Sequence, residues 1–346
     1  MRKILLLLLP FCLNAQIPAY YSGIDFSRNN QDLQADLTEL ITATHHNQIN
    51  YTPNVWNVLL VSDLDLQDPQ KVLLLYGYDD NLDSKYHRTR NKELRNTGGC
   101  GSCVGRWERE HVFPKSLATP PLDTDLPSAG TDAHNLRAVD REMNSMRSNR
   151  PYASSSGNAK TVSGSAFYPG DEWIGDVARI LMYMYLRYET QCNPNNVAWG
   201  STNTYSPNVP DLLLDWNAMD PPSEFEVVRN EVIYNTQGNR NPFIDNPYLA
   251  TLTWGGQNAQ NNWQELSTSS IHPEEYQIKL YPNPTTAIFK IDAKGFKSAN
   301  LYDLSGKILM QNLNSTINLS HLPNGVYIVS ITLDNGSIIA KKIVKN

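Results

Sequence analysis

The hydrophobic pattern of this chain changes its period near residue 276, and this change constrains the fold more than any other feature. Upstream, apolar residues recur at helical spacing, as in "DEWIGDVARILMYMYLRYE" (171–189). Downstream of Tyr276, apolar and polar residues alternate between turn signals such as Asn324-Gly325, which predicts six or seven short strands in a small β-sandwich. Residues 251–273 are rich in Asn, Gln and Ser, which is typical of a linker. We therefore expect a body at 16–250 and a tail domain at 274–346.

Four helices with extended apolar patterns are predicted in the body, apart from a short one near Asp140 that is described below. The strongest covers 171–189, and its expected buried stripe consists of Ile174, Val177, Ile180, Leu181, Met184 and Tyr185. A second follows the capping candidates Asn29, Asn30 and Asp32. The others lie within 209–222, stopped by two prolines, and within 223–235, ended before Gly238.

The chain begins with "MRKILLLLLPFCLNAQ", which is typical of a secretory signal peptide at 1–15 with cleavage before Gln16. Its apolar run is too short to span a bilayer, and no later run is long enough, so we expect no transmembrane segment. Lipidation at Cys12 is disfavoured by Phe11. Export leaves Cys100, Cys103 and Cys192, which predicts one disulfide and one free thiol, with Cys100–Cys103 as the first choice.

The charge distribution does not favour binding of a polyanion over the whole surface. Residues 16–273 hold 19 Lys and Arg against 30 Asp and Glu, a net charge of −11. One stretch, 85–115, is nevertheless basic. It contains Arg88, Arg90, Lys92, Arg95, Arg106, Arg109 and Lys115. This stretch is either a local contact surface for an anion or a solvated face.

Glu110 and His111 are adjacent in "GRWEREHVFPKS" (105–116), and this adjacency limits the local backbone structure. Neighbouring side chains of a regular strand point to opposite faces, so these two share one site only if the strand bends or ends there. Pro114 fits such an ending. The pair therefore indicates a site at a strand end rather than an ordinary strand.

A second polar segment, "GTDAHNLRAVDREMNSMRSNRPYA" (130–153), predicts a strand followed by a helix that opens at Asp140. Glu110 offers a carboxylate and Asn144 a carbonyl oxygen, which are ligand types that Mg²⁺ prefers. His111 would then accept a proton from water as a general base. Arg147 follows Asn144 by one turn and is expected to bind the scissile phosphate.

Four blocks, "RWEREHVFPKS", "DAHNLRAVDREMNSMRSN", "FYPGDEWIGDVARILMYMYLRY" and "RNEVIYNTQGNRNPFIDNP", resemble the secreted endonuclease I family in that order. The resemblance covers about 20–248. It implies an α+β fold: a mainly helical nuclease body around a ββα-metal motif, before the β-sandwich. It also implies hydrolysis of DNA, and often RNA, with little sequence preference.

By this resemblance, His111 is the general base, and Glu110 and Asn144 hold Mg²⁺, with Ca²⁺ or Mn²⁺ as substitutes. The family often places a phosphate-binding arginine between the first two blocks, but 117–131 contains none, so that role passes to Arg109 or Arg147. His134 and Asn135 are expected to support the metal ligands from behind. Residues expected to contact the substrate are Arg88, Arg90, Lys92, Arg95 and Arg240.

The tail contains "YPNPTT", "LYDLSGK" and "LPNGVYIV", and resembles the carboxy-terminal sorting domain of type IX secretion in Bacteroidetes. It implies export by that machinery, then removal or attachment at the cell surface. We expect a monomer.

Two alternatives remain open from the residues. One is a zinc- or calcium-dependent extracellular hydrolase that uses Cys100, Cys103, His111 and His134. The other is a non-catalytic surface adhesin in which the β-sandwich binds. The combination of Glu110, His111 and Asn144 argues against the adhesin.

Overall fold

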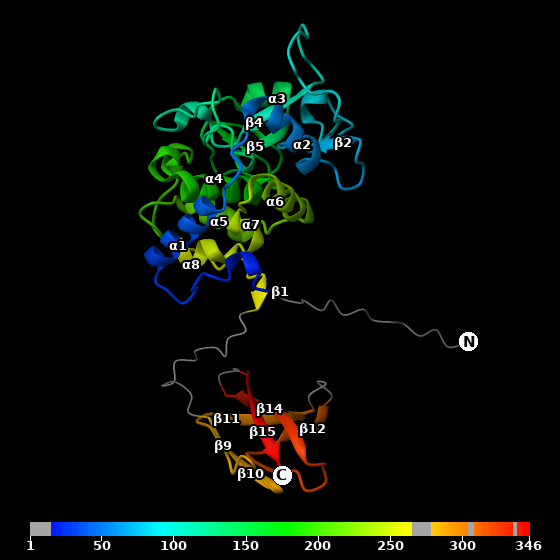
Figure 1. Cartoon of the computed structure of the whole chain (residues 1–346), viewed down its shortest axis with the longest axis vertical. Coiled ribbons are helices and arrows are strands. Elements are labelled where there is room, and N and C mark those ends of the chain that lie inside the picture. Colours follow the sequence, from blue (N-terminus) through cyan, green and yellow to red (C-terminus); the bar gives the residue numbers. More distant parts are fainter. Residues whose placement is uncertain (1–14, 265–277, 304–307, 335–337) are drawn as a thin grey trace, which may run out of the picture. The chain divides into compact units, whose positions relative to one another are not determined.

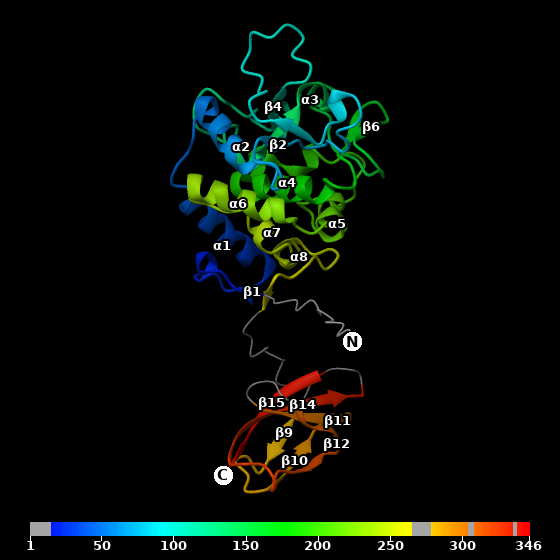
Figure 2. The ribbon, with the colours of Figure 1, turned by 90° about the vertical axis from the view of Figure 1, so that its right-hand side faces the viewer.

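The helix α4 (Ile174–Tyr188) forms the centre of the first of two structural units. Twelve of its fifteen residues are buried, including Gly175, Asp176 and Arg179. The buried surface of α4 is thus wider than the six-residue stripe predicted from the sequence. Of those six residues, only Tyr185 is partly exposed. The helix is apolar on most sides because other helices surround it (Figures 1 and 2).

The computed structural model describes residues 15–264, 278–303, 308–334 and 338–346. It divides into a body, Met1–Gln264, and a tail, Glu265–Asn346. The body's other helices are α1 (Asn30–Ala43), α2 (Trp56–Ser62), α3 (Arg141–Arg147), α5 (Asp211–Met219), α6 (Glu224–Gln237), α7 (Pro242–Asp245) and α8 (Tyr248–Trp254). Its strands pair as β1 (Ala15–Gln16) with β8 (Trp263–Gln264), β2 (Lys71–Leu73) with β3 (Thr89–Asn91), β4 (Trp107–His111) with β5 (Leu136–Asp140), and β6 (Lys160–Val162) with β7 (Ala166–Tyr168).

The predicted helix ends agree with the structure. The Asn29 side chain accepts hydrogen bonds from the main-chain N–H groups of Gln31 and Asp32 and so caps α1. Ser223 and Glu226 form a reciprocal capping box at the start of α6, and Gly238 closes that helix with φ 93°.

The ββα unit consists of β4, β5 and α3. β4 and β5 are antiparallel, with Glu110 opposite Arg137 and His111 opposite Leu136. Asp140 ends β5 and caps α3, as its side chain accepts from the N–H groups of Glu142 and Met143. The sequence-based order of strand, strand and helix is therefore correct.

A buried charge network fixes β5 in place. Asp63, at the end of α2, accepts from Arg137 Nε (3.2 Å), Arg229 Nε (3.0 Å) and the N–H of Ala138 (2.7 Å). Arg137 also donates to Asp176 of α4 (2.7 Å). The strand behind the ββα unit is thus tied to α2, α4 and α6 by groups that would be costly to leave unpaired.

Arg90, expected to contact substrate, instead lies in the interior. It is 5% exposed, forms an ion pair with Asp140 and donates to the main-chain carbonyl oxygens of Ser84 and Arg106. The sequence could not reveal this, because Asp140 is 50 residues away. This position does not favour the expected contact with nucleic acid, and Arg90 instead supports the cap of α3.

We expect Arg90→Gln to lower the free energy of unfolding by about 3 kcal/mol, since it leaves the buried Asp140 without its ion partner. Arg88→Gln, two residues earlier, is the matched control. The side chains of the Arg88–Glu172 pair are 42% and 43% exposed, so the pair should contribute about 1 kcal/mol or less. Urea denaturation of both variants checks this, and equal losses of stability would contradict the buried role of Arg90.

The tail contains two antiparallel sheets that share one apolar core. The strands are β9 (Lys279–Tyr281), β10 (Ile288–Asp292), β11 (Phe296–Tyr302), β12 (Ile308–Leu313), β13 (Thr316–Asn318), β14 (Gly325–Leu333) and β15 (Ile338–Lys345). The sheet orders are β13-β10-β9 and β12-β11-β14-β15. Phe289 of one sheet and Leu301 and Val329 of the other are buried together, as the alternating pattern predicts.

The boundary of the body differs from the prediction. Residues 251–254 continue α8, and Trp263 is 6% exposed and packs into the body's core. The polar composition of 251–264 did not predict this packing, because a single tryptophan is enough to anchor the segment to the core. Residues 265–273 of the expected linker and 1–14 of the expected signal peptide lie outside the described residues. Among the helices of the described part, none is long and apolar enough to cross a membrane.

Candidate active site

His111, the last residue of β4, is held in one orientation. Its Nε2 lies 2.8 Å from the carbonyl oxygen of Gly130, which can only accept, so Nε2 must carry the proton. The ring stacks on Tyr51, with centroids 5.5 Å apart. Enclosure of the imidazole disfavours its charged form and lowers the pKa of His111 to about 4. His111 is therefore a neutral imidazole whose Nδ1 can accept a proton.

Glu110 belongs to the opposite face of β4 and is 3% exposed. Its Oε1 accepts from the Tyr76 hydroxyl (2.9 Å) and lies 3.3 Å from Arg147 Nε. Burial raises the pKa of Glu110 to about 7, although Arg147 and Tyr76 oppose this shift. Within the described part of the chain, Oε2 has no hydrogen-bond partner, so it is available to a cation.

Both side chains nevertheless open into one cavity of about 420 Å³, because β4 ends at His111. Arg109, Asn144 and Arg147 line the same cavity. Asn144 comes from α3, and its Nδ2 donates to Glu108 Oε2 (2.9 Å). This bond turns the amide and leaves its Oδ1 without a partner among the described residues. The strand-end arrangement expected from the sequence is present.

The donor set of this cavity suits a hard divalent cation. A carboxylate oxygen of Glu110 and an amide oxygen of Asn144 are both unpaired, and such a cation prefers oxygen ligands and retains several waters. No cluster of three or more His, Cys, Asp or Glu side chains able to hold a metal occurs in the described residues. A softer metal that requires a complete protein shell therefore fits less well.

Arg147 has a different position from the one expected. It is 1% exposed, and it donates to the carbonyl oxygens of Val112 (2.7 Å) and Ser148 (3.0 Å) while it faces Glu110. Most of its donors are therefore engaged within the protein. Arg147 holds the Glu110 carboxylate and the main chain after β4, and this corrects its expected role as the phosphate ligand.

Arg109 has no carboxylate partner among the described residues. Its guanidinium carbon lies 3.4 Å from the centroid of the Tyr51 ring and 4.3 Å from that of Trp56, and Nη1 donates to Tyr51 O and Thr52 Oγ1. The stacked rings fix the guanidinium and leave its charge uncompensated. Of the two arginines expected to meet the phosphate, Arg109 is better placed.

Asn135 binds the main chain that follows His111. Its Oδ1 accepts from the N–H of Phe113 (2.7 Å), and its own carbonyl oxygen accepts from Val112 (3.0 Å). His134 points elsewhere: it is fully buried, its ring lies against that of Tyr183 at a tilt of 49°, and its Nε2 lies 3.3 Å from the carbonyl oxygen of Asn239. The supporting role expected of His134 therefore does not follow from its contacts.

Asp132 was missed by the sequence analysis. It accepts from the hydroxyl groups of Tyr183 (2.7 Å) and Tyr188 (2.8 Å) and from Gln237 Nε2 (2.9 Å). These bonds anchor 130–135, the segment that presents Gly130 to His111 and Asn135 to Phe113. The only available signal was its place before "AHN", as a cap of a short turn.

The remaining expected substrate contacts are engaged with the protein or lie apart from this cavity. Arg88 pairs with Glu172, Lys92 donates to Pro69 O (3.0 Å), and Arg240 donates to Asp245 and Glu231. Arg95 lines a neighbouring cavity, which it shares with Arg109.

The geometry does not support a zinc site formed by Cys100, Cys103, His111 and His134. Cys100 and Cys103 form a disulfide, as the first choice from the sequence predicted, and Cys192 is a buried free thiol. His134 makes its contacts in the interior rather than beside His111. The four proposed zinc ligands are thus not available as a set.

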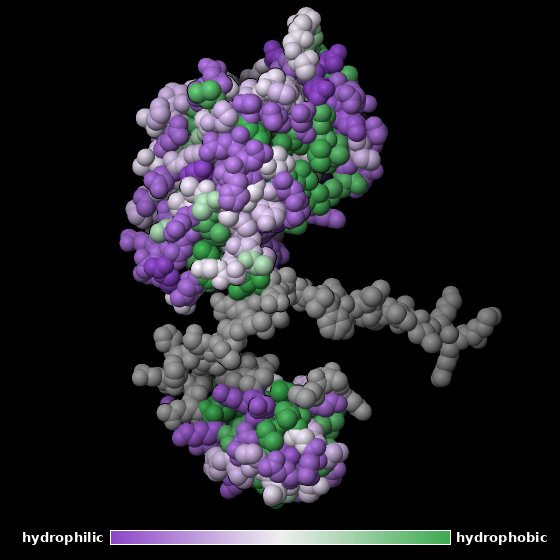
Figure 3. Space-filling view, in the orientation of Figure 1, coloured by the Kyte–Doolittle hydropathy of each residue, from purple (hydrophilic) through white to green (hydrophobic). Residues whose placement is uncertain are grey.

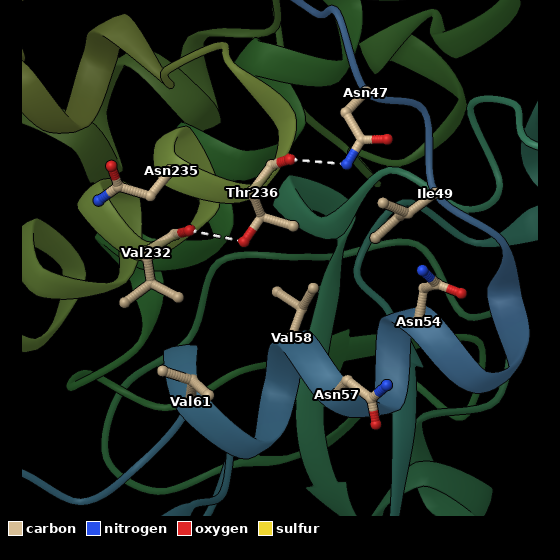
Figure 4. A pocket seen from close by; sticks show the side chains of 9 residues that line it. All are labelled: Asn47, Ile49, Asn54, Asn57, Val58, Val61, Val232, Asn235 and Thr236. Carbon is tan, nitrogen blue, oxygen red and sulfur yellow. Dashed lines mark hydrogen bonds between the residues drawn. The ribbon is translucent and has the colours of Figure 1, made fainter.

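Another cavity, of about 480 Å³, lies between α2 and α6 (Figure 4). Valine and asparagine side chains dominate its lining, and none of the nine lining residues is ionisable. Figure 3 shows apolar side chains on the face of the body where α2 lies, and Val61 is 54% exposed there. Without a general acid or base, this cavity cannot perform hydrolysis.

Comparison with known proteins yields two family matches. The family model described as Endonuclease I matches residues 29–248, and that of the secretion system C-terminal sorting domain matches 279–346. The extracellular ribonuclease of Bacillus subtilis (strain 168) is 35% identical over 251 residues, covering 69% of this chain and 80% of the relative. The extracellular ribonuclease of Bacillus amyloliquefaciens is 33% identical over 253 residues, covering 70% and 80%.

Proposed function

Because the chain belongs to the endonuclease I family and is a secreted nuclease, we propose that it is a Mg²⁺-dependent endonuclease with little sequence preference. One observation carries this proposal. The unprotonated Nδ1 of His111 and two unpaired oxygen ligands, on Glu110 and Asn144, face a single cavity.

In the proposed mechanism, His111 Nδ1 accepts a proton from a water molecule as the water oxygen attacks the phosphorus. The Gly130 carbonyl keeps the imidazole in the required tautomer. Glu110 and Asn144 would hold the cation, whose positive charge would stabilise the negative charge that develops on the phosphate and on the leaving oxygen as the scissile P–O bond breaks. Arg109 donates to a phosphate oxygen, while Arg147 keeps the Glu110 carboxylate in position.

Both DNA and RNA are proposed as substrates. The relatives from two Bacillus species are named as ribonucleases, and the side chains proposed to act contact phosphate and water rather than a base. Contacts to phosphate carry no direct sequence information, which supports low sequence preference. Ca²⁺ or Mn²⁺ would satisfy the same oxygen ligands.

The sorting domain makes the secretion machinery a further partner, and we propose the type IX pathway. The enzyme would then act outside the cell, either released from the tail or attached through it. We propose that it acts as a monomer.

The decisive experiment incubates the purified mature protein with supercoiled plasmid and with a single-stranded RNA, with and without EDTA. We expect nicking and RNA degradation that EDTA stops, and that excess Mg²⁺ restores. Undiminished cleavage in EDTA would exclude the proposed metal dependence. Degradation of only one polymer would restrict the substrate accordingly.

A further inference from the structure

A cavity of about 380 Å³ adjoins the candidate active site, and it is called the second cavity below. Arg109 lines both this cavity and the one that contains Glu110 and His111, and so marks the boundary between the two. The second is also lined by Thr52, Trp56, Asn57, Arg95 and Thr97. None of the residues that line it is Asp or Glu, and the nearby Glu108 carboxylate accepts a hydrogen bond from the side chain of the lining residue Asn96 (2.7 Å). The second cavity therefore combines two arginines with hydroxyl and amide groups in a domain that is otherwise acidic.

The two arginines differ from most arginines of this protein. Of the 14 arginines in the described residues, nine form ion pairs: Arg28, Arg88, Arg90, Arg137, Arg141, Arg147, Arg179, Arg229 and Arg240. Arg95 and Arg109 belong to the five that do not, and they line one cavity together. Two guanidinium groups without an ion pair at one cavity attract an anion, and planar guanidinium groups suit phosphate.

Arg95 is also anchored near the site. It lies in the segment between β3 and β4 that projects from the body in Figures 1 and 2. Its neighbour Asn96 donates from its N–H to Trp107 O (2.7 Å), and Trp107 N–H donates to Leu94 O (3.0 Å). These bonds tie residue 95 to the first residue of β4, so its distance from His111 is set by a short strand.

We propose that this second cavity is a subsite for the sugar-phosphate backbone next to the scissile bond, with Arg95 as the ligand of the flanking phosphate. The inference rests on the proposed nuclease function, and it assigns Arg109 to the boundary between the scissile and the flanking phosphate. A strand bound there passes from the His111 cavity across Arg109 to Arg95. The subsite recognises backbone charge and not base identity.

The test uses trinucleotides with two linkages, in which cleavage of one reference phosphodiester is followed by chromatography. The other linkage is either a charged phosphodiester or a neutral methylphosphonate, placed on the 5′ or the 3′ side. For the wild type, a neutral linkage on one side should lower kcat/KM for the reference bond about tenfold, as expected for loss of one charge-assisted contact.

In Arg95→Gln, kcat/KM on the fully charged trinucleotide should fall about tenfold, and the neutral linkage should then have no further effect. Arg106→Gln is the matched control. It removes the same charge from the same segment, but Arg106 does not line the cavity, so this variant should keep the wild-type response to the neutral linkage.

An Arg95→Gln variant that still responds fully to the neutral linkage would overturn the subsite. Equal behaviour of Arg95→Gln and Arg106→Gln would do the same, because it would assign the effect to net charge. Failure of the nuclease function itself appears differently: the wild type would then cleave none of the trinucleotides. Circular dichroism of each variant confirms that the comparison is between folded proteins.

Discussion

His111→Ala should lower the rate of phosphodiester cleavage by about 10²–10⁴-fold, the loss typical of a missing general base. The Nδ1 of this ring is its free acceptor, since Nε2 is bound to Gly130. Binding of Mg²⁺ and of nucleic acid should change little, because the imidazole is proposed to contact neither. Turnover of plasmid and binding of a labelled oligonucleotide measure the two properties separately.

The control for this experiment is His87→Ala. The Nε2 of His87 also lies beside a main-chain carbonyl oxygen, that of Leu82, but the ring lines a different cavity. This variant should cleave at the wild-type rate. Added imidazole should partly restore His111→Ala, since it supplies the lost acceptor. Near-wild-type turnover of His111→Ala at neutral pH would remove His111 from the mechanism.

The second large effect concerns the metal ligands. Glu110→Gln keeps the size of the side chain but removes the charge that would bind the cation, and we expect activity at low Mg²⁺ to fall at least about 100-fold. Higher Mg²⁺ should recover part of it. Calorimetric titration of Mg²⁺ into the protein should show a matching loss of affinity.

Glu110→Gln also removes the carboxylate that faces the buried Arg147, so it could destabilise the fold. Asn144→Ala separates the two effects. Among the described residues, the side-chain amide of Asn144 bonds to Glu108 and to no other group, so the fold should tolerate the change while Mg²⁺ affinity falls. Full activity of folded Asn144→Ala at low Mg²⁺ would exclude this amide as a ligand.

Local signals in the sequence were sufficient for the helix ends and for the ββα unit. Asn29, Asp140 and Gly238 act within three or four residues of their own positions, so their roles can be read from the chain. The end of β4 at His111 could be predicted because neighbouring strand residues point to opposite faces, so Glu110 and His111 can share one site only where the strand ends.

Contacts between distant segments could not be read in this way. The basic run at 85–115 predicted surface contacts, but whether an arginine is free depends on carboxylates far away in sequence. Arg90 forms an ion pair with Asp140, whereas Arg95 and Arg109 form no ion pair with any described carboxylate. The Gly130 carbonyl and the Asp132 network were invisible for the same reason, since a main-chain acceptor 19 residues away leaves no pattern.

The orientation of His111, the proposed general base, depends on a backbone atom, and this affects how the site tolerates mutation. No side-chain replacement can delete the Gly130 carbonyl, so an alanine scan would pass over the group that sets the tautomer of His111. At residue 130 itself, an added Cβ would collide with the main chain of Asp123. A mutation can therefore displace the Gly130 carbonyl oxygen only by changing the shape of the turn that contains it. The residues that line the cavity are thus not the full set of positions on which the site depends.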